Sequence, residues 1–274
     1  MTGHASEADQ FSFTPFTRHP FFTDVNRWIV KRVIGPSRRV IVDLGCGPGA
    51  VTQLIVDQLG KRHDAKVIGV DPCASALERA RVAVSAGFAE FVEGSAELLS
   101  HVVPSADAVV FCNAIHLIPD KARVLAEIRR VLRRGGVLAF NTTFFNGAYV
   151  DGTSGFWRRW VVRAVQVLRE RGFEVQHAAK ATARAFLTPD EYAAICVQEG
   201  FNRPTIELVR VDLPPESLDD IGHFSLFIEG ALPGVPLAEG AAALREGLER
   251  ALDETGLTSV PRNWLECVAV ASRS

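Results

Sequence analysis

The stretch Val40-Ile41-Val42-Asp43-Leu44-Gly45-Cys46-Gly47-Pro48-Gly49 decides the fold of this 274-residue chain. A short apolar run ends at Asp43 and passes directly into a turn that contains three glycines. The run has the length and composition of a buried strand. Residues 49–60 then show the apolar spacing of a helix, which ends at Gly60. A strand, a glycine-rich turn and a helix in this order predict the start of a parallel α/β unit.

The same alternation continues along the chain. On the amino side, Asp24 is expected to cap a helix that Gly35-Pro36 ends. The further expected strands are 67–70, 88–92, 106–111, 137–142, 205–211 and 264–271, and the further expected helices are 74–86, 120–134, 156–171, 189–199, 217–230 and 237–254. Strands that alternate with helices favour a parallel sheet covered on both faces. We therefore predict an α/β fold with a doubly wound, mostly parallel, seven-stranded Rossmann-like sheet and a helical cap from C-terminal insertions.

Composition excludes several classes of protein. The chain is 47% hydrophobic and 23% charged, with 30 basic and 32 acidic side chains, so it has no global attraction for nucleic acid. Its five cysteines are scattered and form no CxxC pair, which argues against a disulfide framework or a zinc knuckle. No apolar run approaches the roughly 20 residues that span a bilayer, and Met1 to Gln10 is polar, unlike a secretory signal. We expect a cytoplasmic protein.

The glycine-rich turn predicts the class of ligand. Glycines let the backbone approach a ligand closely, and the helix that follows presents free N–H groups at its first turn. Asp71 ends the second expected strand, where a carboxylate can accept hydrogen bonds from ribose hydroxyls. The turn reads GxGxG instead of the dinucleotide pattern GxGxxG. Asp43 would also favour a cationic amino group over a pyrophosphate, so we expect a ligand that contains adenosine and an ammonium group.

Residues 42–49 resemble the first motif of the class I S-adenosylmethionine-dependent methyltransferases of the small-molecule type. The resemblance covers residues 40–143 and includes four further motifs in the family's order, at 67–71, 93–97, 107–117 and 134–138. Two positions depart from the family. Arg134 stands where proline is frequent, and Ser95 stands where many members have aspartate beside the adenine.

The resemblance implies S-adenosylmethionine as the cofactor and a role for each matching residue. Asp43 would anchor the methionine amino group, Asp71 would bind the ribose hydroxyls, and Ser95 would border the adenine with its two neighbours. The full set of cofactor-binding residues implied is Asp43, Gly45, Cys46, Gly47, Gly49, Asp71, Pro72, Ser95, Ala96, Glu97, Asn113 and Ala114. The implied domains are an N-terminal segment and helix (1–36), a cofactor-binding α/β core (37–143), an aromatic-rich insertion or lid (144–187) and the C-terminal part of the sheet (188–274) with a helical cap insertion (214–257).

Two histidines are candidate general bases. Methyl transfer mainly requires alignment of the reacting atoms, but a hydroxyl or an acidic carbon also needs a base to take its proton. His116 follows the fourth strand on the expected substrate side, and His223 lies in the later insertion; either could instead only pack or hydrogen-bond. Asp107, at the start of that strand, should point away from the site. We see no cluster of metal ligands in the sequence.

Aromatic residues are concentrated after residue 143 and favour an apolar or aromatic small-molecule acceptor. The candidate substrate-binding residues are Phe144, Tyr149, Trp157, Phe224 and Phe227. Half of these rings could equally form the core of the cap. The basic amphipathic helix at 156–171 leaves peripheral membrane contact open as a less favoured reading.

The predicted function is methyl transfer to oxygen or carbon of a lipophilic or aromatic small molecule. The alternatives are a protein that binds S-adenosylmethionine without methyl transfer, a nicotinamide-dependent oxidoreductase and, disfavoured by charge, a nucleic-acid methyltransferase. The sequence does not determine the acceptor, the atom methylated or the oligomeric state.

Overall fold

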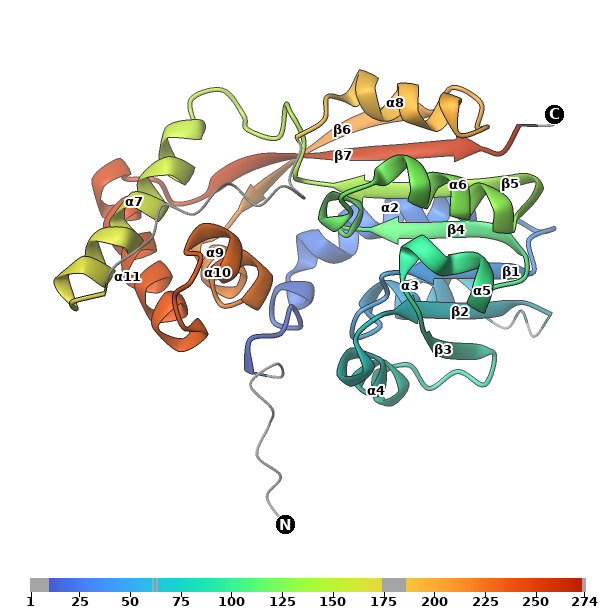
Figure 1. Ribbon diagram of the computed structural model, residues 1–274, viewed down its shortest axis with the longest axis horizontal. Coiled ribbons are helices and arrows are strands. Elements are labelled where there is room, and N and C mark those ends of the chain that lie inside the picture. The colour runs from blue at the N-terminus through green and yellow to red at the C-terminus, as the bar shows by residue number, and fades with distance from the viewer. Residues whose placement is uncertain (1–9, 61, 63, 174–185, 273–274) are drawn as a thin grey trace, which may run out of the picture. The chain divides into compact units, whose positions relative to one another are not determined.

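The computed structural model describes residues 10–60, 62, 64–173 and 186–272 (Figure 1). The chain divides into two compact units. The first, which we call the sheet unit, contains residues Pro20–Ala148, Ala183–Val209 and Trp264–Ser274. The second, the helical unit, contains residues Met1–His19, Tyr149–Thr182 and Arg210–Asn263. Each unit is considered on its own.

Within the described residues, seven strands form one sheet in the order β3-β2-β1-β4-β5-β7-β6. The first five pair in parallel, and β7 runs antiparallel to β5. The strands are β1 (Val40–Leu44), β2 (Lys66–Asp71), β3 (Ala89–Glu93), β4 (Ala106–Cys112), β5 (Leu132–Thr142), β6 (Thr205–Leu213) and β7 (Val260–Val270). The predicted doubly wound, mostly parallel sheet is confirmed. The central strands are apolar on both faces, as expected for strands covered by helices on both sides.

Helices cover the two faces of this sheet. One group, α2 with α3, contacts β4, β5 and β2, and the other, α5 with α6 and α8, lies on the near face in Figure 1. The helices of the sheet unit are α2 (Pro20–Val33), α3 (Ala50–Leu59), α4 (Ala74–Ala83), α5 (Leu99–Val102), α6 (Lys121–Val131) and α8 (Pro189–Gln198). A capping box begins α8, because Thr188 and Glu191 accept from each other's backbone N–H.

Several predicted boundaries are wrong. The helix expected over 120–134 ends at Val131, and β5 already begins at Leu132, so Gly135-Gly136 lies inside a strand. The pairing of β4 with β5 shifts register here, because Ala106 pairs with Leu132 but Ala108 pairs with Val137. The additional residues of β5 between these two pairs form an irregularity of the sheet. Periodicity alone does not reveal this, because Arg133 and Arg134 continue the polar face of the helix.

The first helix also begins earlier than predicted. It starts at Pro20, so Asp24 lies inside α2 and pairs with Arg27 at 3.2 Å instead of capping the helix. A proline at the first helical position loses no hydrogen bond, which makes it a good start. The helix expected over 217–230 is two helices, α9 (Pro215–Gly222) and α10 (Ser225–Ala231).

The helical unit is built around the packing of α7 (Ser154–Glu170) against α11 (Leu237–Thr255). The Trp160 indole N–H donates to the carbonyl of Leu244 at 2.7 Å. Gly247 allows close approach, since a Cβ there would lie 2.5 Å from the backbone nitrogen of Ala164.

Ion pairs with α11 also use basic residues of α7. Arg163 pairs with Glu254 at 2.6 Å, and Arg171, at the end of α7, pairs with Glu246 at 2.8 Å. Because α11 packs against the apolar face of α7, little of that face is left to contact a membrane surface. This argues against the membrane-surface alternative. No helix in the described ranges has the length and apolar character needed to cross a bilayer.

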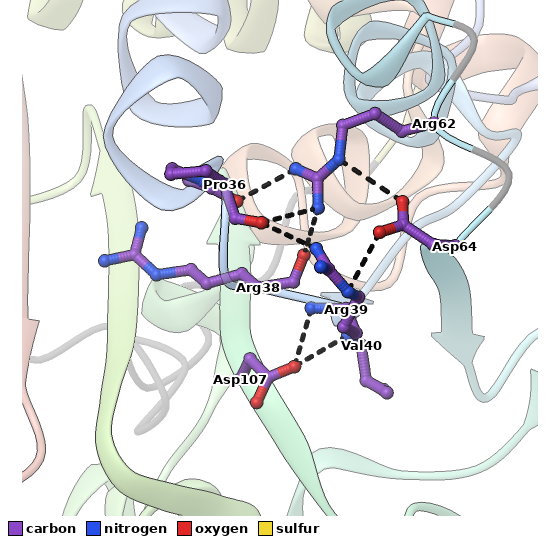
Figure 2. Close-up of polar contacts among 8 residues, drawn as sticks. Pro36, Arg38, Arg39, Val40, Arg62, Asp64 and Asp107 are labelled. Atoms are coloured by element: carbon purple, nitrogen blue, oxygen red, sulfur yellow. Dashed lines mark hydrogen bonds and ion pairs between the residues drawn. The ribbon is translucent and has the colours of Figure 1, made fainter.

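Figure 2 shows a polar cluster at the amino-terminal end of β1, opposite the end that carries the glycine-rich turn. One carboxylate oxygen of Asp107 accepts from the backbone N–H groups of Arg39 and Val40, at 2.7 and 2.9 Å. The other accepts from Arg133 at 2.8 Å. Although burial raises the pKa of Asp107, these hydrogen bonds outweigh it and hold the pKa below its usual value. Asp107 therefore fastens β1 to β4 and is far from the turn, as predicted.

A buried carboxyl group of β7 makes stability depend on pH. Glu266 is fully buried, and neither of its oxygens has a hydrogen-bond partner among the described residues. Burial and the nearby Glu207 carboxylate raise its pKa, Arg32 opposes the rise, and the resulting pKa is about 8. Between the ordinary pKa of 4.5 and about 8 the unfolded chain ionises while the folded chain keeps the proton. Folding is therefore less favourable as the pH rises through this window.

We expect Glu266→Gln to remove this dependence. Its stability relative to the native protein should rise by roughly 1.4 kcal/mol per pH unit between pH 5 and 8, measured by urea unfolding. Glu90→Gln, at an exposed position of β3, is the matched control and should give a difference that does not grow with pH. A constant difference for Glu266→Gln across the window would contradict the prediction.

Candidate cofactor and active site

The turn after β1 is shaped by glycines in the left-handed region. Gly45, Gly47 and Gly49 have φ values of 68°, 51° and 91°, which other residues rarely adopt. A Cβ on Gly49 would lie 3.1 Å from the Cβ of Ala80, so this position also needs a small residue. A Cβ on Gly47 would meet nothing within 4 Å. The backbone of Gly47 therefore borders open space, as a turn that cradles a ligand requires.

Asp43 is buried near the end of β1, with 1% of its surface exposed. Its carboxylate accepts a hydrogen bond of 2.6 Å from the Thr52 hydroxyl on α3. Burial raises the pKa of Asp43, hydrogen bonds from Thr52 oppose the rise and the nearby charge of Asp71 adds to it, so that the pKa is about 7. A cation placed against this carboxylate would favour the charged form.

Asp71 ends β2 and holds the turn from the other side. One oxygen accepts from the backbone N–H of Gly47 at 2.8 Å, and the other accepts from the N–H of Cys73 at 2.9 Å. The segment after β3 lies at the same edge of the sheet, because β2 and β3 are parallel and Asp71 pairs with Glu93. There Ser95 precedes a short 3-10 helix, Ala96–Leu98. The carboxyl ends of β1, β2 and β3 thus bring the predicted residues of this group together.

The segment after β4 supplies the remaining predicted residues of the sheet unit. Asn113 and Ala114 follow the strand directly, and a Cβ on Gly45 would lie 3.0 Å from the Cβ of Ala114. The two turns are therefore in close contact. His116 lies in the short 3-10 helix Ile115–Leu117 and is 8% exposed.

The orientation of His116 is determined by two neighbours. Its Nδ1 lies 3.2 Å from the hydroxyl of Thr142 at the end of β5, and its ring stacks on Phe144 with centroids 4.2 Å apart. The Thr142 hydroxyl in turn accepts from the backbone N–H of Phe144 at 3.0 Å. This arrangement fixes the ring and occupies Nδ1, which is how proteins orient a histidine that acts through its other nitrogen.

The other predicted substrate and catalytic residues belong to the helical unit. Tyr149 and Trp157 both lie against the Arg262 guanidinium, whose carbon is 4.9 and 4.5 Å from their ring centroids. Phe224 lies against Phe13, and Phe227 lies against Trp160. The Nδ1 of His223 is 3.5 Å from Arg245, which pairs with Asp219. The structure brings only Phe144 to His116, and roles for the others stay predictions.

Some residues of the site were missed by sequence reasoning. Thr52 and Thr142 contact Asp43 and His116 directly, and both are fully buried. A signal was present for Thr52, because it lies on the apolar face of α3 with Val51, Ile55 and Leu59. Within the residues that the structure describes, no group of three His, Cys, Asp or Glu side chains could hold a metal ion.

Comparison with known proteins identifies the domain. Residues 42–140 match the family model described as a methyltransferase domain. These residues form a class I methyltransferase domain. S-adenosylmethionine is the cofactor of such a domain, in agreement with the sequence prediction. The match includes Asp43, the glycine-rich turn, Asp71 and the segment after β4.

Curated relatives of this methyltransferase domain are named for different small molecules. The trans-aconitate 2-methyltransferase of Azoarcus sp. is 39% identical over 119 residues, which are 43% of this chain and 44% of that protein. The chain therefore aligns with less than half the length of that relative. The demethylmenaquinone methyltransferase of Thermotoga maritima is 29% identical over 179 residues, 63% of this chain and 74% of that protein.

A solved structure shares the fold along most of the chain. A Bacillus halodurans protein described as a methyltransferase superposes with a TM-score of 0.60 and 16% identity, over 91% of this chain and 99% of that one. At this identity the similarity concerns the fold.

The described residues fit S-adenosylmethionine. The donor carries an ammonium group, ribose hydroxyls and an adenine, and the site offers a buried carboxylate, a second carboxylate and a glycine turn open at Gly47. We expect affinity for S-adenosylhomocysteine, which keeps the ammonium group, to fall as the pH drops from 8 to 6. Asp43 then takes up a proton that it must lose to pair with the ligand. Calorimetry across this range measures the change.

Asp43→Asn should weaken binding by about 10- to 100-fold, the range for a lost charged hydrogen bond, and should flatten the pH dependence. Asp57→Asn, at an exposed position of α3, is the matched control and should keep both affinity and pH dependence. If the native protein binds equally at pH 6 and 8, Asp43 is not the partner of the ammonium group.

Proposed function

We propose that the protein transfers the methyl group of S-adenosylmethionine to oxygen or carbon of a lipophilic or aromatic small molecule. The main support for this proposal is the position of His116. It is buried beside Phe144, in the short helix after β4, and the end of β4 borders the glycine turn. A base next to an aromatic ring at this place suits an acceptor with an acidic hydroxyl or carbon. A cytoplasmic location is part of the proposal.

The cofactor roles are proposed residue by residue. Asp43 pairs with the methionine ammonium, and Asp71 exchanges its backbone hydrogen bonds for those of the ribose hydroxyls. Ser95 and its neighbours Ala96 and Glu97 border the adenine. The backbones of Gly45, Cys46, Gly47 and Gly49, with Pro72, Asn113 and Ala114, enclose the rest.

The mechanism depends on alignment more than on covalent chemistry. When bound, S-adenosylmethionine supplies an electrophilic methyl group on a sulfonium. The two acidic strand ends hold the ammonium and ribose, which fixes the direction of the methyl group. His116, oriented through Nδ1 by Thr142, takes the acceptor's proton at Nε2. Phe144 packs on the imidazole and keeps water from this side of the ring.

The acceptor class is supported by the aromatic ring beside His116. Phe144, which is partly exposed, contributes aromatic surface next to His116. The relatives are named for two different small molecules, trans-aconitate and demethylmenaquinone, so an acceptor cannot be carried over from either. The test is transfer of a radiolabelled methyl group to phenols, quinols, trans-aconitate and an extract of small metabolites.

We expect His116→Gln to lower kcat by about 10²- to 10⁴-fold, the range for loss of a general base. The amide cannot accept the proton, while cofactor affinity by calorimetry should change less than threefold. His223→Gln measures the second candidate in the same assay. His101→Gln, exposed on α5, is the control that should retain full activity.

The outcomes separate the alternatives. If His223→Gln lowered kcat and His116→Gln did not, the general base would be His223, in the helical unit. Tight cofactor binding without transfer to any acceptor would favour a protein that binds S-adenosylmethionine for another purpose. Thermal stabilisation by a nicotinamide cofactor instead would support the oxidoreductase alternative.

A further inference from the structure

Asn113 has an unusual backbone conformation. Its φ is 54°, the only positive value of a non-glycine residue in the part of the chain that the structure describes. Asparagine tolerates the left-handed region better than most residues with a Cβ, but the conformation still costs free energy that contacts with neighbouring groups must offset. Asn113 directly follows β4, at the turn that contacts the glycine loop.

Four hydrogen bonds with three different elements restrain this residue, one of them from its backbone N–H to the Asn141 carbonyl at 3.1 Å. The Trp264 indole N–H on β7 donates to the Asn113 side-chain oxygen at 2.9 Å. The Asn113 side-chain nitrogen donates to the Asn26 oxygen on α2 at 3.2 Å. The backbone N–H of Asn113 donates to the side-chain oxygen of Asn141 on β5 at 2.9 Å. Both ends of the amide and the backbone are thus held.

The restraining residues are themselves fixed. Asn141 donates to the Asn26 oxygen at 2.9 Å, which closes a ring of three asparagines, and Asn26 donates to the carbonyl of Phe22 at 2.7 Å. Asn26 and Asn141 are fully buried, and Trp264 is 1% exposed. Buried amides are costly unless their hydrogen bonds are made, so the ring has few alternative arrangements.

The restrained turn determines where two site residues lie. Ala114 comes next in the chain and contacts the Gly45 turn, and the 3-10 helix that carries His116 starts immediately afterwards. A change in the Asn113 backbone would therefore shift Ala114 against the glycine turn.

We propose that Asn26, Asn141 and Trp264 are positioning residues, which hold Asn113 in the left-handed conformation and thereby set the methionine end of the cofactor site. The proposal rests on the proposed function. Asn26 and Trp264 lie outside residues 42–140, which match the methyltransferase family model. Elements on both sides of that domain therefore complete its site.

The experiment measures affinity for S-adenosylhomocysteine by calorimetry in the full chain. Trp264→Phe removes the indole donor while it keeps an aromatic ring against Phe21. We expect about a tenfold weaker affinity, because the disfavoured turn loses one restraint. Asn26→Leu removes the shared acceptor and should weaken binding at least as much. The matched control is Trp28→Phe on α2, whose ring contacts Arg32 and not the network; its affinity should stay within twofold.

A backbone test separates positioning from general destabilisation. Glycine adopts a positive φ without strain, so Asn113→Ala should weaken binding more than Asn113→Gly does. In the Asn113→Gly background, Trp264→Phe should cost no further affinity. Thermal melting of each variant shows that it is folded at the assay temperature.

Two results overturn the proposal: unchanged affinity in folded Trp264→Phe, or an equal loss from Trp264→Phe in both backgrounds. Absence of binding by the native protein would instead reject the proposed function. The two failures are therefore distinguishable.

Discussion

The carboxylate of Asp43 is buried at the end of a central strand, where water cannot solvate its charge. Thr52 donates a hydrogen bond to it, and a second carboxylate, that of Asp71, lies close enough to raise its pKa further. Such a group is stabilised when a cation arrives. The glycine turn has a left-handed backbone and is open at Gly47, so it leaves room for the rest of the ligand that contains the cationic group.

The two ends of the sheet use carboxylates in opposite ways. At the amino end, hydrogen bonds to Asp107 lower its pKa and fasten two strands. At the carboxyl end, burial raises the pKa of Asp43 and leaves it ready for a ligand. The same residue type thus serves folding at one end and binding at the other, and the difference lies in how many N–H groups reach the carboxylate. Glu266 is a third case, with a raised pKa and no described hydrogen-bond partner.

Local sequence patterns were sufficient to predict the sheet and the glycine-rich turn, while the roles of the cofactor residues stay predictions. Apolar runs that end at Asp43 and Asp71 marked β1 and β2, and the glycine spacing marked the turn between β1 and α3. The predicted end of the helix before β5 is wrong because two patterns overlap there. Arg133 continues the polar face of the helix in the sequence, but its backbone belongs to β5. The asparagine ring was beyond prediction, because its members are separated by 28, 87 and 115 residues. Only the fold brings them together.

The contact between Trp264 and Asn113 has a consequence for synthesis. Chains emerge from the ribosome amino end first, and 151 residues separate these partners. The nascent chain can form β1 to β5 and the glycine turn long before β7 exists. The turn after β4 acquires the restraint from Trp264 only when β7 is released from the ribosome. Under the proposed arrangement, full capacity to hold the methyl donor is gained only after β7 has been made.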